Sequence, residues 1–535
     1  MTTGVTPINR AFNLVPKRAE ARHAERLRAT FVDSGVAAAL EAIDHQVLYG
    51  RRGTGKTHAL RYLETLVVAR HDVAVYADLR TLGSPEGLFL GDVVPATERA
   101  GRLLVDLLGQ VGDALLAAAL DDDELIADTA FLSKLDALFE AITAVRVAGD
   151  VEISREGEDK SAGVAGSSVG LSVNPSAIGF DASASRTSSE ESRQLRRETR
   201  RGAEQIGLNF SDVARALREI AGTLTSKRAW LLLDEWSSVP IDVQPYLAEF
   251  LVRCVLPLQM FTVKIAAIER QSRFMLEQDD GTIVGIELGA DVAANVDLDE
   301  FMVFEQNEER ARSFFRGLLF KHLTLGVDDE EKVPGLQKEA DLMRLGFTDK
   351  RAFDELVRAA EGVPRDAINI AAKAALRAGA AQISVPDIRA AARAWFQADK
   401  EAALRSREEA LRLLNWVIDR VIRQKKARGF LVNQRSSGAP MLLTLFDARV
   451  LHLVRRGYSA QDEPGERFDV YVIDYGAYVD LINTKNEPQG TLAAGDNDDS
   501  GFVDVPTQDL RAIRRAILNL DEFTATRPLS PSDEG

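Results

Sequence analysis

GRRGTGKT, residues 50–57, matches the spacing G-x-x-x-x-G-K-[ST] of two glycines, a lysine and a hydroxyl residue. The preceding HQVLYG (45–50) is a short apolar run suited to a buried strand, and the following KTHALRYLETLVVAR (56–70) carries apolar residues at helical spacing. A strand, a glycine-rich turn and a helix are the context that the motif requires. The sequence therefore predicts a phosphate-binding loop between a strand and a helix.

The chemistry of this loop indicates nucleotide binding. Glycines let the backbone wrap around an anion, which both the loop N–H groups and the positive end of the helix dipole face. Lys56 would reach the β- and γ-phosphates, and the Thr57 hydroxyl would ligate Mg²⁺. We therefore expect ATP and Mg²⁺ as cofactors. The loop residues expected to bind ATP are Gly50, Arg51, Arg52, Gly53, Thr54, Gly55, Lys56, Thr57 and His58.

A pair of acids follows a second apolar run, in RAWLLLDEWSS (228–238). A nucleotide-hydrolysing P-loop protein needs carboxylates at the end of a neighbouring strand, and Asp234 and Glu235 fit this Walker B pattern. Asp234 would bind ATP and hold Mg²⁺ through water, while Glu235 would polarise the water that attacks the γ-phosphate. The alternative, a solvated start of a loop, is weakened by the preceding P-loop.

Two later motifs complete the pattern. The apolar run FTVKIAAI (261–268) leads into ERQSRF, where a polar residue could sense the γ-phosphate, and the candidates are Glu269, Arg270, Gln271 and Arg273. The segment EGVPRDA opens a helix within an alanine-rich helical region. Its arginine, Arg365, has two interpretations: a functional role at the nucleotide, or an ion pair at the start of that helix.

These motifs together resemble the AAA+ ATPases, most closely the origin-recognition and replication-initiator clade. The resemblance implies an α/β P-loop core with a parallel sheet and flanking helices (1–305), a helical lid (306–400) and a C-terminal winged-helix-like domain (401–490). It also implies a sensor-2 role for Arg365 over the γ-phosphate, and a homo-oligomer in which an arginine acts in trans, with Arg270 and Arg273 as candidates. The clade usually has a small polar sensor where this chain has Glu269.

Composition sets the broad class of the protein. A length of 535 residues with 45% hydrophobic content allows about three or four domains. A single cysteine, Cys254, excludes an intramolecular disulfide framework, and the first residues lack an apolar signal, so we expect a cytoplasmic protein. Charges interrupt the apolar segments, which predicts no membrane contact. The net charge of −16 restricts nucleic-acid contacts to local basic patches.

The core contains an insertion, because Lys56 and Asp234 lie 178 positions apart. Two strand-helix-strand crossovers of roughly 30 or more residues each would need only about 60 to 80. We place the insertion at about 96–206, with helices near 96–120 and 124–147.

Two features of this insertion have alternative interpretations. The Gly- and Ser-rich stretch at 169–182 alternates as in a β-hairpin, and the alternative is a flexible linker. The arginines that follow would share one helical face, either as a solvated surface paired with nearby acids or as a contact to a polyanion or an acidic neighbouring subunit. They are Arg193, Arg196, Arg197, Arg200 and Arg201.

The C-terminal region is interpreted as a helix ending near Gln424, a second helix over Pro440–Gly457 and two short strands within Arg467–Ile482. Helices followed by a β-hairpin resemble a winged helix, which in the initiator clade touches DNA but elsewhere binds protein. The tail, 491–535, is acidic with a predicted short helix near 508–519. The cations available for DNA are Arg423, Lys425, Lys426, Arg428, Arg449, Arg455 and Arg456.

The leading hypothesis is an AAA+ switch that binds and hydrolyses ATP, self-assembles, and acts on double-stranded DNA or a DNA-associated partner. Its catalytic residues would be Glu235, Lys56 and Arg365. The alternative is a nucleotide-regulated component of a defence or transposition system that controls a separate effector protein through protein contacts only. A third interpretation is a nearly inactive nucleotide-binding scaffold.

Overall fold

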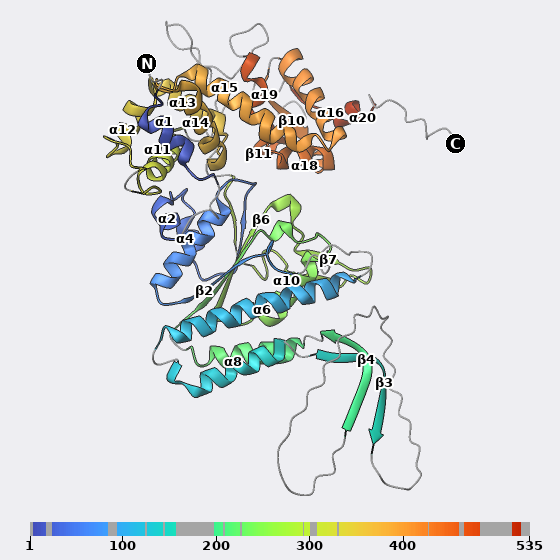
Figure 1. Ribbon diagram of the computed structural model, residues 1–535. Coiled ribbons are helices and arrows are strands. Elements are labelled where there is room, and N and C mark those ends of the chain that lie inside the picture. Colours follow the sequence, from blue (N-terminus) through green and yellow to red (C-terminus); the bar gives the residue numbers. More distant parts are fainter. Residues whose placement is uncertain are drawn as a thin grey trace.

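The chain forms a core around a parallel sheet, a group of helices that follows it, and a C-terminal module defined here as residues 408–481 (Figure 1). The computed structural model describes residues 4–17, 24–83, 94–122, 126–142, 145–156, 197–206, 209–224, 227–292, 294–299, 308–328, 331–425, 427–459, 465–481 and 516–525.

The central sheet has the order β2-β5-β6-β1-β9, and every pairing in it is parallel. Its strands are β1 (Gln46–Tyr49), β2 (Val73–Asp78), β5 (Ala229–Asp234), β6 (Phe261–Ala267) and β9 (Ala294–Asp297). All residues of β1, β5 and β6 are buried, as expected for parallel strands covered on both faces. The predicted α/β core is therefore confirmed.

Helices cover both faces of this sheet. One face packs through Leu48 and Leu232 against Leu60 and Leu63 of α4. The opposite face packs mainly against α6 and α10. The helices of the core are α2 (Ala24–Thr30), α3 (Ala37–Leu40), α4 (Lys56–Ala69), α6 (Ala96–Leu120), α8 (Thr129–Ile142), α9 (Phe210–Ala221) and α10 (Gln244–Cys254), and β7 (Met275–Glu277) pairs with β8 (Ile283–Gly285).

The insertion at about 96–206 contains α6, α8 and an antiparallel pair, β3 (Val145–Glu156) and β4 (Arg197–Ile206). Figure 1 shows β3 and β4 extending beyond α8, away from the sheet. The predicted helix at 124–147 is wrong at its end, because residues 145–147 are in β3. The predicted helical arginine face is also wrong for residues 197–201, which are in a strand. The predicted hairpin at 169–182 lies outside the described residues.

Helix α6 is the one helix of the described chain that is long and apolar enough to cross a membrane by length and composition. Its leucines, among them Leu104, Leu107 and Leu108, are buried in the core cluster that includes β2, α8 and α10. This is the packing of a core helix, for which such a composition is weak evidence of a membrane span.

A helical group follows the sheet: α11 (Glu308–Thr324), α12 (Glu339–Gly346), α13 (Lys350–Ala360), α14 (Pro364–Ala378) and α15 (Val385–Trp395). Helix α1 (Pro7–Leu14) lies at the other end of the sequence, yet it packs against α14. Asn9 fixes this contact by donating to the carbonyl oxygens of Gly379 and Ala381, at 2.9 and 2.8 Å. The lid assignment and its boundary at 305/306 stay predictions.

The C-terminal module has a mixed order of helices and strands. It contains α16 (Glu408–Val417), η7 (Ile418–Gln424), β10 (Gly429–Asn433), α17 (Gln434–Ser437), α18 (Pro440–Asp447), β11 (Leu451–Ser459), β12 (Arg467–Ile473), α19 (Tyr475–Tyr478) and η8 (Val479–Leu481). The predicted helix over 440–457 is wrong after α18, and the predicted second strand after Asp474 is α19 instead. The hairpin is β11–β12, within an antiparallel sheet of order β10-β12-β11.

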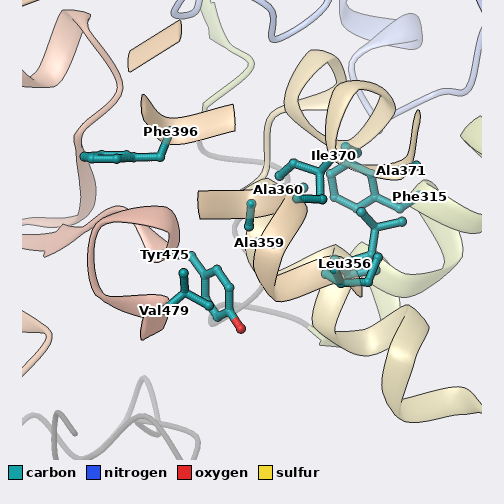
Figure 2. Close-up of a cluster of buried hydrophobic side chains, with 14 of the residues drawn as sticks. Phe315, Leu356, Ala359, Ala360, Ile370, Ala371, Phe396, Tyr475 and Val479 are labelled. Carbon is teal, nitrogen blue, oxygen red and sulfur yellow. The ribbon is translucent and has the colours of Figure 1, made fainter. Parts of the chain in front are cut away.

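The helical group and the C-terminal module share one hydrophobic core. Figure 2 shows side chains of α13 and α14, including Leu356, Ala360 and Ile370, in a cluster with Tyr475 and Val479 of the module. A buried ion pair, in which Nη2 of Arg428 donates to both carboxylate oxygens of Glu361 at 2.6 and 2.8 Å, adds to this contact. The module is therefore fixed to the helices by packing rather than by a linker alone.

Residues 516–518 of the tail contact β10. Leu431 of β10 donates its N–H to the Ala516 carbonyl and accepts from the N–H of Leu518, both at 2.9 Å. The helix α20 (Leu520–Ala525) follows. The predicted helix near 508–519 is therefore wrong over 516–519, and the rest of it lies outside the described residues.

Candidate nucleotide-binding site

A cavity of about 380 Å³ lies between the glycine-rich loop, the end of β5 and the start of α14. These three segments are far apart in the sequence. Eight predicted site residues line the cavity: Arg52, Gly53, Gly55, Lys56, Thr57, His58, Glu235 and Arg365. Gly50, Arg51, Thr54 and Asp234, which were also predicted, are not among its described lining residues.

The glycine-rich loop leaves β1 after Tyr49 and enters α4 at Lys56. Gly53 has a φ of 89°, and a Cβ there would lie 2.8 Å from the Cβ of Arg365, so only glycine fits this approach. The N–H of Arg365 donates to the Gly53 carbonyl at 3.2 Å. The loop is thus held directly against the first turn of α14.

Lys56 is buried, and its Nζ donates to the carbonyl oxygens of Gly50 at 2.7 Å and Arg51 at 3.1 Å. Burial lowers the pKa of Lys56, although Glu235 opposes this effect. No side chain caps α4, whose N-cap is Gly55. The first N–H groups of α4 therefore have no side-chain acceptor from the cap residue, and Gly55, Lys56 and Thr57 line the cavity.

Asp234 and Glu235 occupy different environments at the end of β5. Asp234 is fully buried and accepts from the Tyr76 hydroxyl at 2.7 Å and from the Glu235 N–H at 2.8 Å. Glu235 lines the cavity. Its backbone is left-handed (φ 57°), a conformation that costs a non-glycine residue about 1–2 kcal/mol. Burial and the neighbouring Asp234 raise the pKa of Glu235.

Arg80 also lines the cavity, although it lies outside the predicted motifs. It follows β2, whose Asp78 is in register with Asp234 of the adjacent strand β5. Its Nη2 contacts Asp78 at 2.6 Å, and its Nη1 lies 3.7 Å from Glu235. Burial alone would raise the pKa of Asp78, but hydrogen bonds from Arg80 lower it. The position of Arg80 directly after a strand, at the sheet edge that carries Asp234, is the sequence signal that could have indicated this residue.

Further lining residues lie beside the motifs or in segments without a motif. His58 Nε2 lies 2.7 Å from the Leu27 carbonyl, and its ring lies 6.1 Å from that of His322. Lys17 Nζ donates to the carbonyls of Asn13 and Val15. The full set that was missed is Pro16, Lys17, Leu27, Arg80, Ser238, Leu318, His322, Pro364 and Ile368.

The four candidates for a γ-phosphate sensor after β6 do not line the described cavity. Glu269 pairs with Arg456, and the Gln271 amide donates to Asp447 at 2.9 Å, so both face the C-terminal module. Arg270 stacks on Phe446 of the same module, and Arg273 donates to the Met275 carbonyl. Three residues at the tip of β6 therefore contact the module, and the sensor role of this segment stays a prediction.

Several cations predicted for DNA are already used inside the protein. Arg428 and Arg449 are buried in ion pairs, and Arg456 pairs with Glu269. Lys425 donates to the Ile517 carbonyl at 3.2 Å, and Arg423 lies 3.7 Å from Asp419. Lys426 lies outside the described residues.

The comparison with protein-family models gives one finding. Residues 14–83, from the end of α1 through the glycine-rich loop to the residues after β2, match the family model described as ORC-CDC6-like. None of the curated proteins compared with the chain matches it. The match supports a relationship to the AAA+ proteins of the origin-recognition and CDC6 type.

Proposed function

We propose that this protein binds ATP with Mg²⁺ and hydrolyses it as an AAA+ switch of the origin-recognition type. The observation that supports the proposal is the single cavity shared by Lys56, Thr57, Glu235 and Arg365. A phosphate chain needs the loop and helix N–H groups on one side and positive charge around it, and this cavity offers both. Self-assembly and a cytoplasmic location are parts of the same proposal.

Lys56 must change partners when ATP binds. Its ammonium now donates to the carbonyls of Gly50 and Arg51, and the β- and γ-phosphates would replace these weaker acceptors. The Thr57 hydroxyl, which lies at the cavity, would ligate Mg²⁺, and Asp234, which is buried and does not line the cavity, would hold the ion through water. This donor set fits, because Mg²⁺ keeps several waters and needs only one or two carboxylates besides the phosphates. The bound ion would neutralise charge that develops on the transferred phosphoryl group.

Glu235 is the base in this proposal. Its raised pKa makes the carboxylate a better proton acceptor, and its left-handed backbone conformation is the kind of local strain that recurs at active sites. Arg80 restrains its carboxylate from the side of β2. Arg365, whose Nε is buried without a hydrogen-bond acceptor, would stabilise the γ-phosphate.

Replacing Lys56 tests nucleotide binding. Lys56→Ala should bind ATP about 10- to 100-fold more weakly, because it removes a hydrogen bond between charged groups worth about 1.5–3 kcal/mol. Titration of a fluorescent ATP analogue in the presence of Mg²⁺ measures this change. Lys350→Ala, at an exposed residue of α13, is the matched control and should bind as the parent does. Equal affinities of parent and Lys56→Ala would contradict the assignment of the loop.

For the partner, we propose double-stranded DNA at the β11–β12 hairpin, with the C-terminal module acting as a winged helix. The module has the order helix, strand, two helices and two strands, and the exposed arginines Arg455 and Arg467 lie on the hairpin. Arg435 on α17 is exposed as well. Arg455 was indicated by the sequence and Arg467 and Arg435 were not, and all three support phosphate contacts better than the buried Arg428 and Arg449.

Salt dependence tests the DNA contact. Affinity should fall with a log-log slope of about −0.9 per phosphate neutralised, and Arg455→Glu with Arg467→Glu should weaken binding and reduce that slope by about 1 for each arginine. The matched control, Arg215→Glu with Arg218→Glu, changes the charge equally on α9 and should leave the slope unchanged. No DNA retention by the parent at low salt would favour the alternative, control of a separate effector through protein contacts.

A further inference from the structure

The side chain of Arg51 turns away from the cavity although the residue belongs to the glycine-rich loop. Asp299 after β9 accepts from both its main-chain N–H and its Nε, at 2.8 and 2.9 Å. Its Nη1 donates to the Leu451 carbonyl at 3.2 Å and to His452 Nδ1 at 2.9 Å, and its guanidinium lies 4.9 Å from the Phe446 ring centre. The C-terminal module therefore contacts the glycine-rich loop through a side chain that does not line the cavity.

The contacts of His452 define its protonation state. A guanidinium can only donate, so Nδ1 must accept from Arg51, and Nε2 must carry the proton that is donated to Asp474 Oδ2 at 2.9 Å. A second proton on the ring, at Nδ1, would place an N–H donor of His452 against the N–H donor of Arg51. Burial, and then the charge of Arg51, lower the pKa of His452 to about 4. The imidazole is thus a neutral bridge between a cation and an anion.

A series of buried ion pairs continues from Asp474. Lys400, which follows α15, contacts Asp474 and lies 2.9 Å from Asp366 Oδ2. Arg449, between α18 and β11, donates to Asp366 Oδ1 at 2.6 Å. The side chains of Lys400, Asp366 and Asp474 are at most 2% exposed, so these charges depend on one another for neutralisation.

The series returns to the cavity at Arg365. Arg449 contacts Asp399 with its second terminal nitrogen, and Asp399 Oδ1 lies 3.7 Å from Arg365 Nη2. Two cavity segments, the glycine-rich loop and the first turn of α14, are therefore both connected to the C-terminal module. With His452 neutral, the charges balance. The cations are Arg51, Lys400, Arg449 and Arg365, and the anions are Asp299, Asp474, Asp366 and Asp399.

We propose that the C-terminal module is an integral part of the nucleotide site, and that His452 is a positioning residue that holds the glycine-rich loop through Arg51. This inference rests on the proposed binding of ATP. A phosphate that draws Lys56 away from the Gly50 and Arg51 carbonyls acts on the same residue that His452 holds. Because such coupling is reciprocal, docking of the module strengthens ATP binding and ATP strengthens docking of the module. A partner that pulls β11 away would release the nucleotide.

Two substitutions of His452 separate positioning from simple packing. His452→Gln can still accept from Arg51 with its carbonyl and donate to Asp474 with its amide, whereas His452→Leu can do neither. We expect Leu to weaken ATP binding by at least about fivefold, the lower end of usual coupling, and Gln to restore most of the affinity. The measurement is titration of the full-length variants with a fluorescent ATP analogue and Mg²⁺.

Arg423→Gln is the matched control, because it breaks an exposed pair with Asp419 inside η7 of the same module and leaves the contacts between the module and the core intact. Its affinity for ATP should equal that of the parent. Equal affinities for parent and His452→Leu would overturn the inference, as would equally weak binding by the Leu and Gln variants.

Hydrogen exchange of the parent protein supplies a second test that needs no variant. ATP should slow exchange of the β11 amides, and unchanged exchange in the presence of bound ATP would overturn the inference while leaving the proposed function intact. Failure of the parent to bind ATP at all would instead contradict the proposed function and the inference with it.

Discussion

Glu235→Gln should bind ATP as the parent does and hydrolyse it about 10²- to 10⁴-fold more slowly. That range is the usual contribution of a general base. The amide keeps the size of the side chain and removes the proton acceptor, so the loop and Lys56 still meet the phosphates. Burial and Asp234 raise the pKa of Glu235 toward the working pH, which makes the loss larger than for a fully solvated carboxylate.

The measurement is phosphate release at saturating ATP and Mg²⁺, together with titration of the analogue. Glu277→Gln in β7, which is exposed and does not line the cavity, is the matched control and should hydrolyse ATP at the parent rate. Hydrolysis by Glu235→Gln at the parent rate would remove Glu235 from the role of base and direct attention to another cavity residue. Loss of binding would indicate that Glu235 supports the site rather than the chemical step.

Local sequence predicted the parts of the fold whose signals are local. The apolar runs at 45–50, 230–233 and 261–268 became β1, β5 and β6, and the helix after the loop became α4. Each of these three strands is fully buried in a parallel sheet, where continuous apolar sequence is required. The loop needs only eight consecutive residues for its chemistry, so its place at a cavity could be anticipated without knowledge of the rest of the chain.

The segment 440–457 shows why other elements could not be predicted. Its apolar residues fit helical spacing, but α18 ends at Asp447 and Arg449 adopts a left-handed backbone conformation with φ 62°. The following residues pair with β12 instead. A strand of this kind is stabilised by its partner rather than by its own residues, so short-range periodicity cannot distinguish it from a helix.

Arg51 shows the same limit at the site. The motif leaves its position unspecified, and its partners Leu451 and His452 are 400 and 401 positions away. Nothing in the sequence near residue 51 indicates that its side chain leaves the cavity. The sequence could predict which residues form the loop, but the tertiary structure decides which of their side chains face the nucleotide.

Lys400→Met should lower the free energy of unfolding by about 3–5 kcal/mol, the usual cost of removing one partner from a buried ion pair. Methionine fills a similar volume, so the loss arises from the charges of Asp366 and Asp474 that remain in the interior. Arg102→Met is the matched control, because its pair with Glu98 is about 40% exposed on both sides and should contribute at most about 1 kcal/mol. Both variants are compared by urea unfolding at pH 7.

The pH dependence of stability distinguishes this charge effect from a packing defect. Burial alone would raise the pKa of Asp366, but Arg449 and Lys400 hold this pKa below its ordinary value of 3.8. The ionised carboxylate therefore stabilises the folded parent above pH 3.8, and this contribution is lost as the pH falls below 3.8. Because Lys400→Met has already lost part of this stabilisation, the difference between parent and variant should narrow below pH 3.8. A difference that stays constant with pH, or one of less than 1 kcal/mol at pH 7, would show that Lys400 does not stabilise the network through its charge.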